Sequence, residues 1–398
     1  MKTFVSIKRV MLFGLTSITL SVPAISSDKT SKEEKTVKDL KQIMSRTNAV
    51  GLAVAVVKDG KIIFLKSLGK KNIEENINLD TKDLFRIASI SKSFTATAIM
   101  QLREKDKLRL NQDISELIGF RVRNPKFPDV PITVKMLLSH TSSLNDSLGY
   151  FQLDVIDPAK NPNYAKAYHY YAPGTNYDYC NLGFNILGTL VEKISGERFD
   201  NYIHNHIIKP LGLNANHNVD SLDASKFVTL YEVDPATNKL APQPAAYRSR
   251  GTEIESGYVM GYSAPLFSPT GGVKISAEDL AKYMIMHMNY GKKGSVRIIS
   301  RESSRMMQTP IVEVDKWNQY CIALKHTTNL IPGLNMVGHT GSAYGVYSAM
   351  FFDPDKKFGF VMMTNGCDPA YKDGWVVIIR DVIQTLYQNF IEKQVPKT

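Results

Sequence analysis

The segment Arg86–Met100, RIASISKSFTATAIM, places Ser89 and Lys92 three residues apart at the start of an apolar run. Residues three apart share one face of a helix, so these two side chains are expected to be neighbours. Burial lowers the pKa of a lysine, and the neutral amine can then take the proton of a serine nucleophile. Apolar residues at helical spacing predict such burial: Phe94, Ala98, Ile99 and Leu102.

The Ser-x-x-Lys pattern does not identify a catalytic pair by itself. It occurs also at Ser26–Lys29 and at Ser67–Lys70, and short motifs match by chance. The alternative interpretation is that Ser89 caps the N-terminus of a helix and that Lys92 is solvated. The choice between the two depends on the rest of the chain.

Residues 1–26 have the pattern of a secretory signal. Lys2, Lys8 and Arg9 precede the apolar core VMLFGLTSITLSV, and small residues suited to cleavage follow it. The core is too short for a comfortable membrane span. We therefore expect an exported protein, periplasmic or extracellular, with an uncleaved signal acting as a membrane anchor as the alternative.

Charge and cysteine content exclude several classes of protein. The 398-residue chain has a formal net charge of +11, and removal of residues 1–26 with their three basic residues leaves +8. No basic run alternates with aromatic residues, so nucleic-acid binding is not expected. Three cysteines in an exported chain argue against a disulfide framework. No His-Glu-x-x-His or Cys-x-x-Cys pattern occurs, so neither a metal nor another cofactor is expected.

Both ends of the chain predict strands of one antiparallel sheet. GLAVAVV and IIFLKSLG flank a turn at Asp59-Gly60, and VYSAMFF and FGFVMMT flank the turn DPDKK. Ser31 with Glu34 fits the capping box of a first helix, and a last helix is expected from Trp375. Helical patterns dominate residues 86–225.

This order predicts an α+β fold in which helices flank the sheet and an all-helical lobe is inserted between its two halves. After the signal, the domain comprises residues 27–398. The expected boundaries are about 32–85 and 273–395 for the α/β lobe and about 86–272 for the mostly helical lobe. A hairpin is expected at FVTLYEV, DPATNK and LAP.

Two further triplets follow the Ser89 motif in order, Tyr179-Cys180-Asn181 and His339-Thr340-Gly341. With them the chain resembles the serine β-lactamase and penicillin-binding-protein family, in particular the branch of class C β-lactamases, D,D-carboxypeptidases, esterases and D-amino-acid peptidases. That branch carries Ser-x-x-Lys, Tyr-x-Asn and Lys-or-His-x-Gly in this order. The stretches VKMLLSHTSSL and SPTGGVKISAEDLAKYM extend the resemblance. It implies a β-lactamase/transpeptidase-like fold.

The resemblance also implies roles for the motif residues. Ser89 is the expected nucleophile, and Lys92 and Tyr179 are both candidate bases, since an adjacent ammonium could hold a tyrosine partly as phenolate. The backbone amides of Ser89 and Ser342 are the expected oxyanion donors, the latter on an edge strand. The expected substrate-binding residues are Asn181, His339, Thr340, Gly341 and Ser342.

His339 stands where β-lactamases of this branch usually carry lysine. A histidine is mostly neutral above about pH 6.5 unless its neighbours shift its pKa. We therefore expect the attraction of the site for anionic substrates to fade as the pH rises.

These features predict a serine hydrolase that works through an acyl-enzyme on Ser89. The expected substrates are D-amino-acid peptides of the cell-wall type. The alternatives are a small-ester hydrolase, a class C-like β-lactamase and a penicillin-binding sensor that deacylates slowly. The expected partner is a small-molecule or peptide substrate such as a cell-wall fragment, with membrane contact only if the signal is uncleaved.

Overall fold

The computed structural model describes residues 1–3, 25–237 and 239–392. Most of the predicted signal lies outside these residues. Helix α1 (Ile25–Arg46) begins before Ser31, so the predicted capping box is wrong and Ser31 lies inside the helix. Serine is tolerated within helices, so a capping pattern does not fix where a helix starts. Within the described residues, no helix has both the length and the apolar character needed to cross a membrane.

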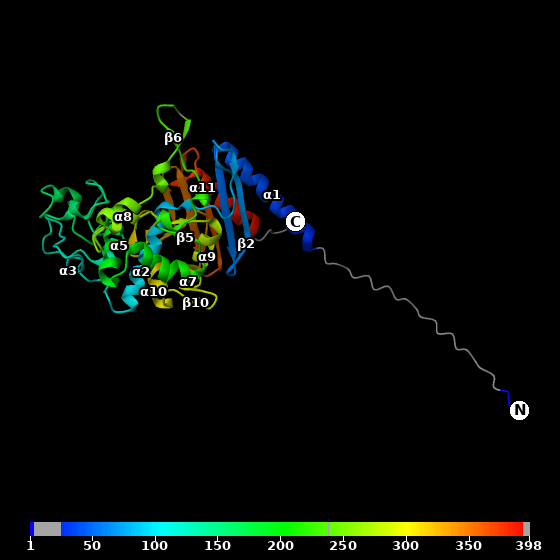
Figure 1. Cartoon of the computed structure of the whole chain (residues 1–398), viewed down its shortest axis with the longest axis horizontal. Helices are drawn as coiled ribbons and strands as arrows, with labels where there is room; N and C mark the ends of the chain where they lie inside the picture. Colours follow the sequence, from blue (N-terminus) through cyan, green and yellow to red (C-terminus); the bar gives the residue numbers. More distant parts are fainter. Residues whose placement is uncertain (4–24, 238, 393–398) are drawn as a thin grey trace.

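A nine-stranded antiparallel sheet joins the two ends of the chain within the described residues (Figure 1). Strand β1 (Gly51–Lys58) lies between β2 (Lys61–Asn72) and β16 (Phe358–Thr364). Strand β16 also pairs with β15 (Val346–Asp353), which pairs with β14 (Met336–Ala343). This confirms the predicted fold class. Beyond β2, the sheet ends with β3 (Ile77–Asn78). Beyond β14, it continues with β13 (Lys325–Thr327), β12 (Asn318–Tyr320) and the edge strand β11 (Val312–Glu313).

The predicted hairpins are confirmed. Asp59 and Gly60 connect β1 to β2 with φ angles of 51° and 74°, the left-handed pair that suits a two-residue turn. Strand β6 (Tyr231–Asp234) pairs with β7 (Lys239–Pro242). The remaining short strands are β4 (Phe85–Arg86), β5 (Ala215–Asn216), β8 (Lys274–Ile275), β9 (Lys292–Lys293), β10 (Val296–Arg297), β17 (Tyr371–Lys372) and β18 (Trp375–Val376).

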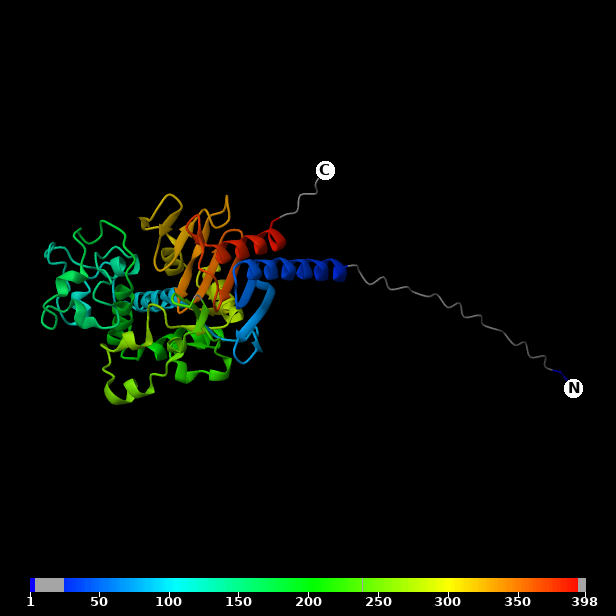
Figure 2. The same ribbon diagram turned by 90° about the horizontal axis from the view of Figure 1, so that it is seen from above.

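Helices cover both faces of the sheet. Alternate residues of β1 point to opposite faces, and Leu52, Val54 and Val56 join a core with α1 and α11 (Val377–Phe390). The other face packs against α9 (Ala277–Met288) and the main core. Figure 2 shows α1 and α11 side by side along their face of the sheet.

The segment between β2 and α9 holds the Ser89 motif near its start. Helix α2 (Ser91–Glu104) is buried from Ser91 to Gln101 and packs against α5 (Asn181–Ser195) and α6 (Phe199–Ile203). A helix buried on all sides is a rigid support for the residues at its start. The remaining α-helices are α3 (Ser115–Ile118), α4 (Val134–Leu138), α7 (Lys209–Leu211), α8 (Gly251–Gly257) and α10 (Arg301–Gln308).

Candidate active site

Ser89 lies in a strained turn that leads into α2. It belongs to a single 3-10 turn, Ala88–Ile90, and Ala88 has a φ of 47°, which is costly for a residue with a Cβ. The Ile87 amide donates to the Val273 carbonyl at 3.0 Å, and the Ser348 hydroxyl donates to the Ile87 carbonyl at 3.0 Å. Every residue from 83 to 102 is buried except Ser89. The turn therefore presents the Ser89 hydroxyl alone to an incoming molecule.

Lys92 is fully buried and contacts Ser89 directly. Its Nζ lies 3.1 Å from Ser89 Oγ, 2.8 Å from Asn181 Oδ1 and 2.9 Å from the Thr270 carbonyl. Burial lowers the pKa of Lys92 to about 7, although the nearby Asp146 carboxylate acts to raise it. The interpretation of Lys92 as a solvated lysine is therefore wrong.

The three contacts of Lys92 also determine where its lone pair points. The Asn181 and Thr270 oxygens are carbonyl acceptors, so a neutral amine donates its two hydrogens to them. The remaining position on the nitrogen faces the Ser89 hydroxyl. This is the geometry of an amine that accepts the serine proton.

Tyr179 lies against the same pair. Its ring centroid is 4.8 Å from Lys92 Nζ, and its buried hydroxyl has no hydrogen-bond partner among the described residues. Burial raises the pKa of the Tyr179 phenol, and the nearby Ser89 hydroxyl lowers it by less. The expectation of a partly ionised Tyr179 is therefore wrong, because burial disfavours the phenolate. A protonated phenol at this position can donate a hydrogen bond to a leaving group.

Asn181 is oriented by a carboxylate that the sequence motifs do not include. The Asp146 carboxylate accepts hydrogen bonds at 2.9 Å from the Asn181 amide, the Asn181 side-chain nitrogen and the Leu182 amide. Asp146 thus caps the N-terminus of α5, where a negative charge is favourable. This arrangement turns Asn181 Oδ1 towards Lys92 and Thr270 Oγ1, which donates to it at 2.7 Å. One hydrogen of the Asn181 amide is left for a substrate.

We expect Asp146→Asn to change both stability and the pH profile. Loss of the charged cap should cost about 1 kcal/mol of unfolding free energy. Loss of a negative charge that raises the pKa of Lys92 should also move the acidic limb of kcat/KM to lower pH. Thermal unfolding and a pH–rate profile measure the two effects, with Asp129→Asn at an exposed carboxylate as control. A stability loss with an unmoved limb would mean that Asp146 acts only as a cap.

His339 belongs to a buried chain of hydrogen bonds. The Cys180 amide donates to His140 Nδ1 at 3.1 Å, and Tyr320 Oη lies 3.1 Å from both His140 Nε2 and His339 Nε2. His339 Nδ1 lies 2.5 Å from the Thr340 carbonyl, which can only accept. These contacts assign one tautomer to each ring: His140 donates from Nε2 to Tyr320, and Tyr320 donates to His339. Both imidazoles are therefore neutral in this network.

The neutral network corrects the expectation for His339. Its side chain is only 5% exposed, and burial, with a further contribution from the Lys92 charge, lowers its pKa to about 3. The predicted titration near pH 6.5 is therefore wrong, because the prediction assumed a solvated ring. His339 connects β14 to Tyr320 through this hydrogen bond, and its contact with substrate stays a prediction. The sequence motifs did not indicate Tyr320, whose strand β12 has only three residues.

Strand β14 approaches the Ser89 turn closely. A Cβ on Gly341 would lie 2.1 Å from the Ile87 carbonyl, so only glycine fits there. β14 is an interior strand and not the predicted edge strand, but β13 pairs only with Met336–Gly338. Residues 339–343 pair with β15 alone, and this free stretch carries the half-buried Thr340 and the exposed Ser342. The two predicted oxyanion donors, Ser89 and Ser342, thus lie on adjoining segments.

Comparison with known proteins agrees with this arrangement. A family model described as Beta-lactamase matches residues 37–380. Penicillin-binding protein 4 of Amycolatopsis lactamdurans is 27% identical over 331 residues, which cover 79% of this chain and 81% of that protein. Protein flp of Staphylococcus aureus (strain MRSA252) is 23% identical over 322 residues, and the match covers 79% of this chain but only 59% of that protein.

Solved structures share the fold. The octameric penicillin-binding protein homologue from Pyrococcus abyssi superposes with a TM-score of 0.70 at 26% identity, covering 91% of this chain and 79% of that one. EstCE1, described as a hydrolase with promiscuous acyltransferase activity, has a TM-score of 0.70 at 20% identity and covers 90% of this chain and 100% of its own. The likeness to EstCE1 concerns the fold alone. Together these matches confirm the β-lactamase/transpeptidase-like fold expected from the sequence.

Proposed function

The chain belongs to the β-lactamase family of serine hydrolases, and we propose from this premise that it acts through an ester formed on Ser89. Ser89 Oγ bonds to the substrate acyl carbon while its proton passes to Lys92. The bond from that carbon to the leaving nitrogen or oxygen then breaks, and the leaving group takes the proton from the Lys92 ammonium while the Tyr179 phenol donates a hydrogen bond to it. Water next attacks the ester, which releases the acid and restores the Ser89 hydroxyl.

The observation that carries this proposal is the buried amine of Lys92 against Ser89. A base works best when its pKa lies near the working pH, and the pKa of Lys92 is about 7. Tyr179 is the weaker candidate, because burial raises the pKa of its phenol. We therefore propose Lys92 as the base and Tyr179 as the hydrogen-bond donor to the leaving group.

We propose D-amino-acid peptides and amides as the substrates. Support comes from the similarity to penicillin-binding protein 4 and from the export signal expected at residues 1–26. The neutral His339 offers no cation to a free carboxylate at that position. This favours amides and internal peptide bonds over peptides that are cleaved next to their C-terminal carboxylate, and it disfavours β-lactams, which carry a carboxylate. Small esters, which also carry no carboxylate, are the second candidate.

A comparison of kcat/KM values tests the substrate class. We expect D-alanine p-nitroanilide to be hydrolysed faster than L-alanine p-nitroanilide, and p-nitrophenyl acetate faster than nitrocefin at pH 8. A preference for nitrocefin would contradict the proposal in favour of a β-lactamase. A burst equal to the enzyme concentration with no later turnover would instead indicate a sensor that does not deacylate.

The buried His339 also predicts a constant substrate preference between pH 6 and pH 8. Its pKa of about 3 keeps the ring neutral over this range, so no positive charge appears for an anionic substrate as the pH falls. The ratio of kcat/KM for nitrocefin to that for p-nitrophenyl acetate should therefore stay the same. Titration of Lys92 changes kcat/KM for both substrates by the same factor, so its effect cancels in the ratio. A ratio that rises several-fold at pH 6 would show that His339 gains a proton.

A further inference from the structure

Two buried cations lie next to each other just before the Ser89 turn. Arg86 in β4 pairs directly with Lys274 in β8. Their side chains are only 8% and 4% exposed. Directly opposed residues of an antiparallel pair point to the same face, and like charges there repel each other. Both side chains stay charged only if a group of opposite charge lies near them, because burial and the Arg86 charge lower the pKa of Lys274.

Neutral oxygens provide the contacts of both cations. Arg86 donates to the Gly271 and Ala246 carbonyls at 3.1 Å and to Ser268 Oγ at 3.4 Å. Lys274 uses one of its three donors, on the His217 carbonyl at 2.6 Å. Within residues 25–237 and 239–392, neither side chain forms an ion pair with a carboxylate. Burial lowers the pKa of Lys274, and the Arg86 and Arg250 charges lower it further. The Asp220 carboxylate acts to raise this pKa but accepts the Arg250 amide at 3.1 Å.

A small enclosed cavity of about 20 Å³ lies between these groups. Its lining includes no carboxylate, and its polar side chains are those of Arg86, Lys274, His217, Ser268, Arg248, Arg250 and Tyr344. Both ring nitrogens of His217 are buried and have no hydrogen-bond partner among the described residues. About 10–15 Å³ of such space holds one water-sized particle. The cavity therefore fits a single atom surrounded by donors.

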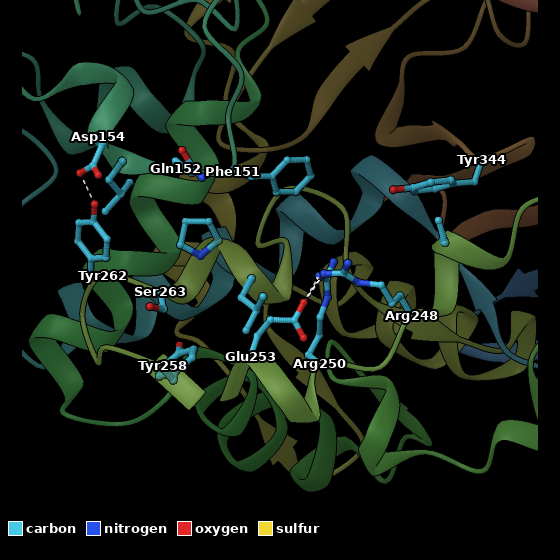
Figure 3. A pocket seen from close by; sticks show the side chains of 15 residues that line it. Phe151, Gln152, Asp154, Arg248, Arg250, Glu253, Tyr258, Tyr262, Ser263 and Tyr344 are labelled. Carbon is cyan, nitrogen blue, oxygen red and sulfur yellow. Dashed lines mark hydrogen bonds and ion pairs between the residues drawn. The ribbon is translucent and has the colours of Figure 1, made fainter. Parts of the chain in front are cut away.

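The small cavity adjoins a larger one. A hollow of about 630 Å³ shares Arg248, Arg250 and Tyr344 with it. Figure 3 shows Arg248 and Arg250 converging on Glu253, with Tyr344 across the hollow. Glu253 thus offsets one of the two outer arginine charges and forms no ion pair with Arg86 or Lys274.

We propose that the cavity between Arg86, Lys274 and His217 binds one halide-sized monovalent anion, with chloride as the occupant. A water molecule fits the volume but provides no charge to offset two buried cations. A carboxylate provides the charge but has three heavy atoms, too many for about 20 Å³. The anion accepts from the guanidinium, the ammonium and one imidazole N–H, which gives His217 the partner that it lacks.

The same segment connects this site to Lys92. Ser268 and Gly271 accept hydrogen bonds from Arg86, and the Thr270 carbonyl between them accepts from Lys92. Lys274 follows three residues after Gly271 in the same chain. An anion that holds Arg86 and Lys274 together therefore holds the segment that orients the proposed base. We expect it to act on stability first and on activity only through this segment.

Thermal unfolding of the full chain tests the proposal. At constant ionic strength, replacement of gluconate by chloride or bromide should raise the Tm by about 2–4 °C with saturation, whereas replacement by acetate should not. Lys274→Met should abolish the halide effect, and Lys61→Met, at an exposed lysine, should preserve it. An equal Tm in gluconate and chloride, or an equal halide effect in Lys274→Met, would overturn the proposal.

A direct measurement decides the question if Lys274→Met does not fold. Crystals of the unchanged protein grown with bromide should show an anomalous scattering peak between Arg86, Lys274 and His217. Absence of that peak at a bromide concentration that raises the Tm would place the stabilising ion elsewhere and contradict the site. A peak for bromide that acetate removes would indicate a carboxylate site instead.

Discussion

Ser89→Ala is expected to abolish covalent labelling and to lower kcat on any accepted ester or amide by on the order of a thousandfold or more. The acyl-enzyme needs a nucleophilic oxygen, and Ser89 is the one residue between 83 and 102 that is not buried. Among the described residues, no other hydroxyl lies within hydrogen-bond distance of Lys92 Nζ. The variant keeps only the oxyanion donors and the binding surface, which explains why the expected loss is large.

Ser67→Ala is the matched control for this experiment. Ser67 and Lys70 have the same Ser-x-x-Lys spacing, but they lie on β2, where successive side chains alternate between faces. A fluorescent fluorophosphonate should label the wild type and Ser67→Ala equally and leave Ser89→Ala unlabelled. Peptide mass spectrometry should place the adduct on Ser89. Labelling of Ser89→Ala at the wild-type level would assign the nucleophile to another residue.

Local patterns were sufficient to predict much of this molecule. The apolar stretches on either side of the Asp59-Gly60 turn predicted a hairpin, and the structure has one. A first helix was also predicted, and its Leu40 and Ile43 pack in the core. These features depend on residues close together in the sequence, so periodicity and turn chemistry determine them. The family was predicted from the order of three motifs, at Ser89, Tyr179 and His339, that lie far apart in the sequence.

Other features depend on contacts that no spacing reveals. Asp146 reaches the start of α5 from a loop, and nothing in its local sequence connects it to Asn181. Tyr320 lies on a strand of only three residues, which is too short to show the alternating sequence pattern of a strand. The neutral state of His339 follows from burial by Tyr320 and its neighbours, whereas the sequence suggested a solvated ring. The charge state of a buried side chain depends on its tertiary packing. The sequence therefore predicted which residues form the site but not which of them are charged.

Burial of Lys92 connects the fold to the proposed chemistry. An isolated buried ammonium is unfavourable, and the pKa of a buried lysine falls until the neutral form dominates near neutral pH. Helix α2 provides this burial because every residue from Ser91 to Gln101 is buried. The same packing provides two carbonyl acceptors for the amine, at Asn181 and Thr270. The arrangement that weakens the charge of Lys92 therefore also points its lone pair at Ser89.

Lys92→Met and Lys92→Arg are expected to lose activity to a similar extent, by about a hundredfold to ten-thousandfold in kcat/KM. Methionine removes the amine, and arginine keeps a positive charge but cannot accept a proton near neutral pH. If Lys92 contributed only its charge to the site, Lys92→Arg would retain much of the rate. A comparison of the two variants on one ester thus separates a base from a fixed cation.

The pH profile of the wild type provides the second test of Lys92. Only the neutral amine can accept the Ser89 proton, so kcat/KM should fall as the pH drops below the Lys92 pKa of about 7. A tenfold change in the neutral fraction for each unit below the pKa makes kcat/KM at pH 6 about one-tenth of that at pH 8. Tyr179→Phe should lower the rate but keep this limb, because the phenol of Tyr179 has its pKa raised far above this range. If the limb disappears in Tyr179→Phe and persists in Lys92→Met, the proton acceptor is Tyr179, and the assignment of Lys92 as the base is wrong.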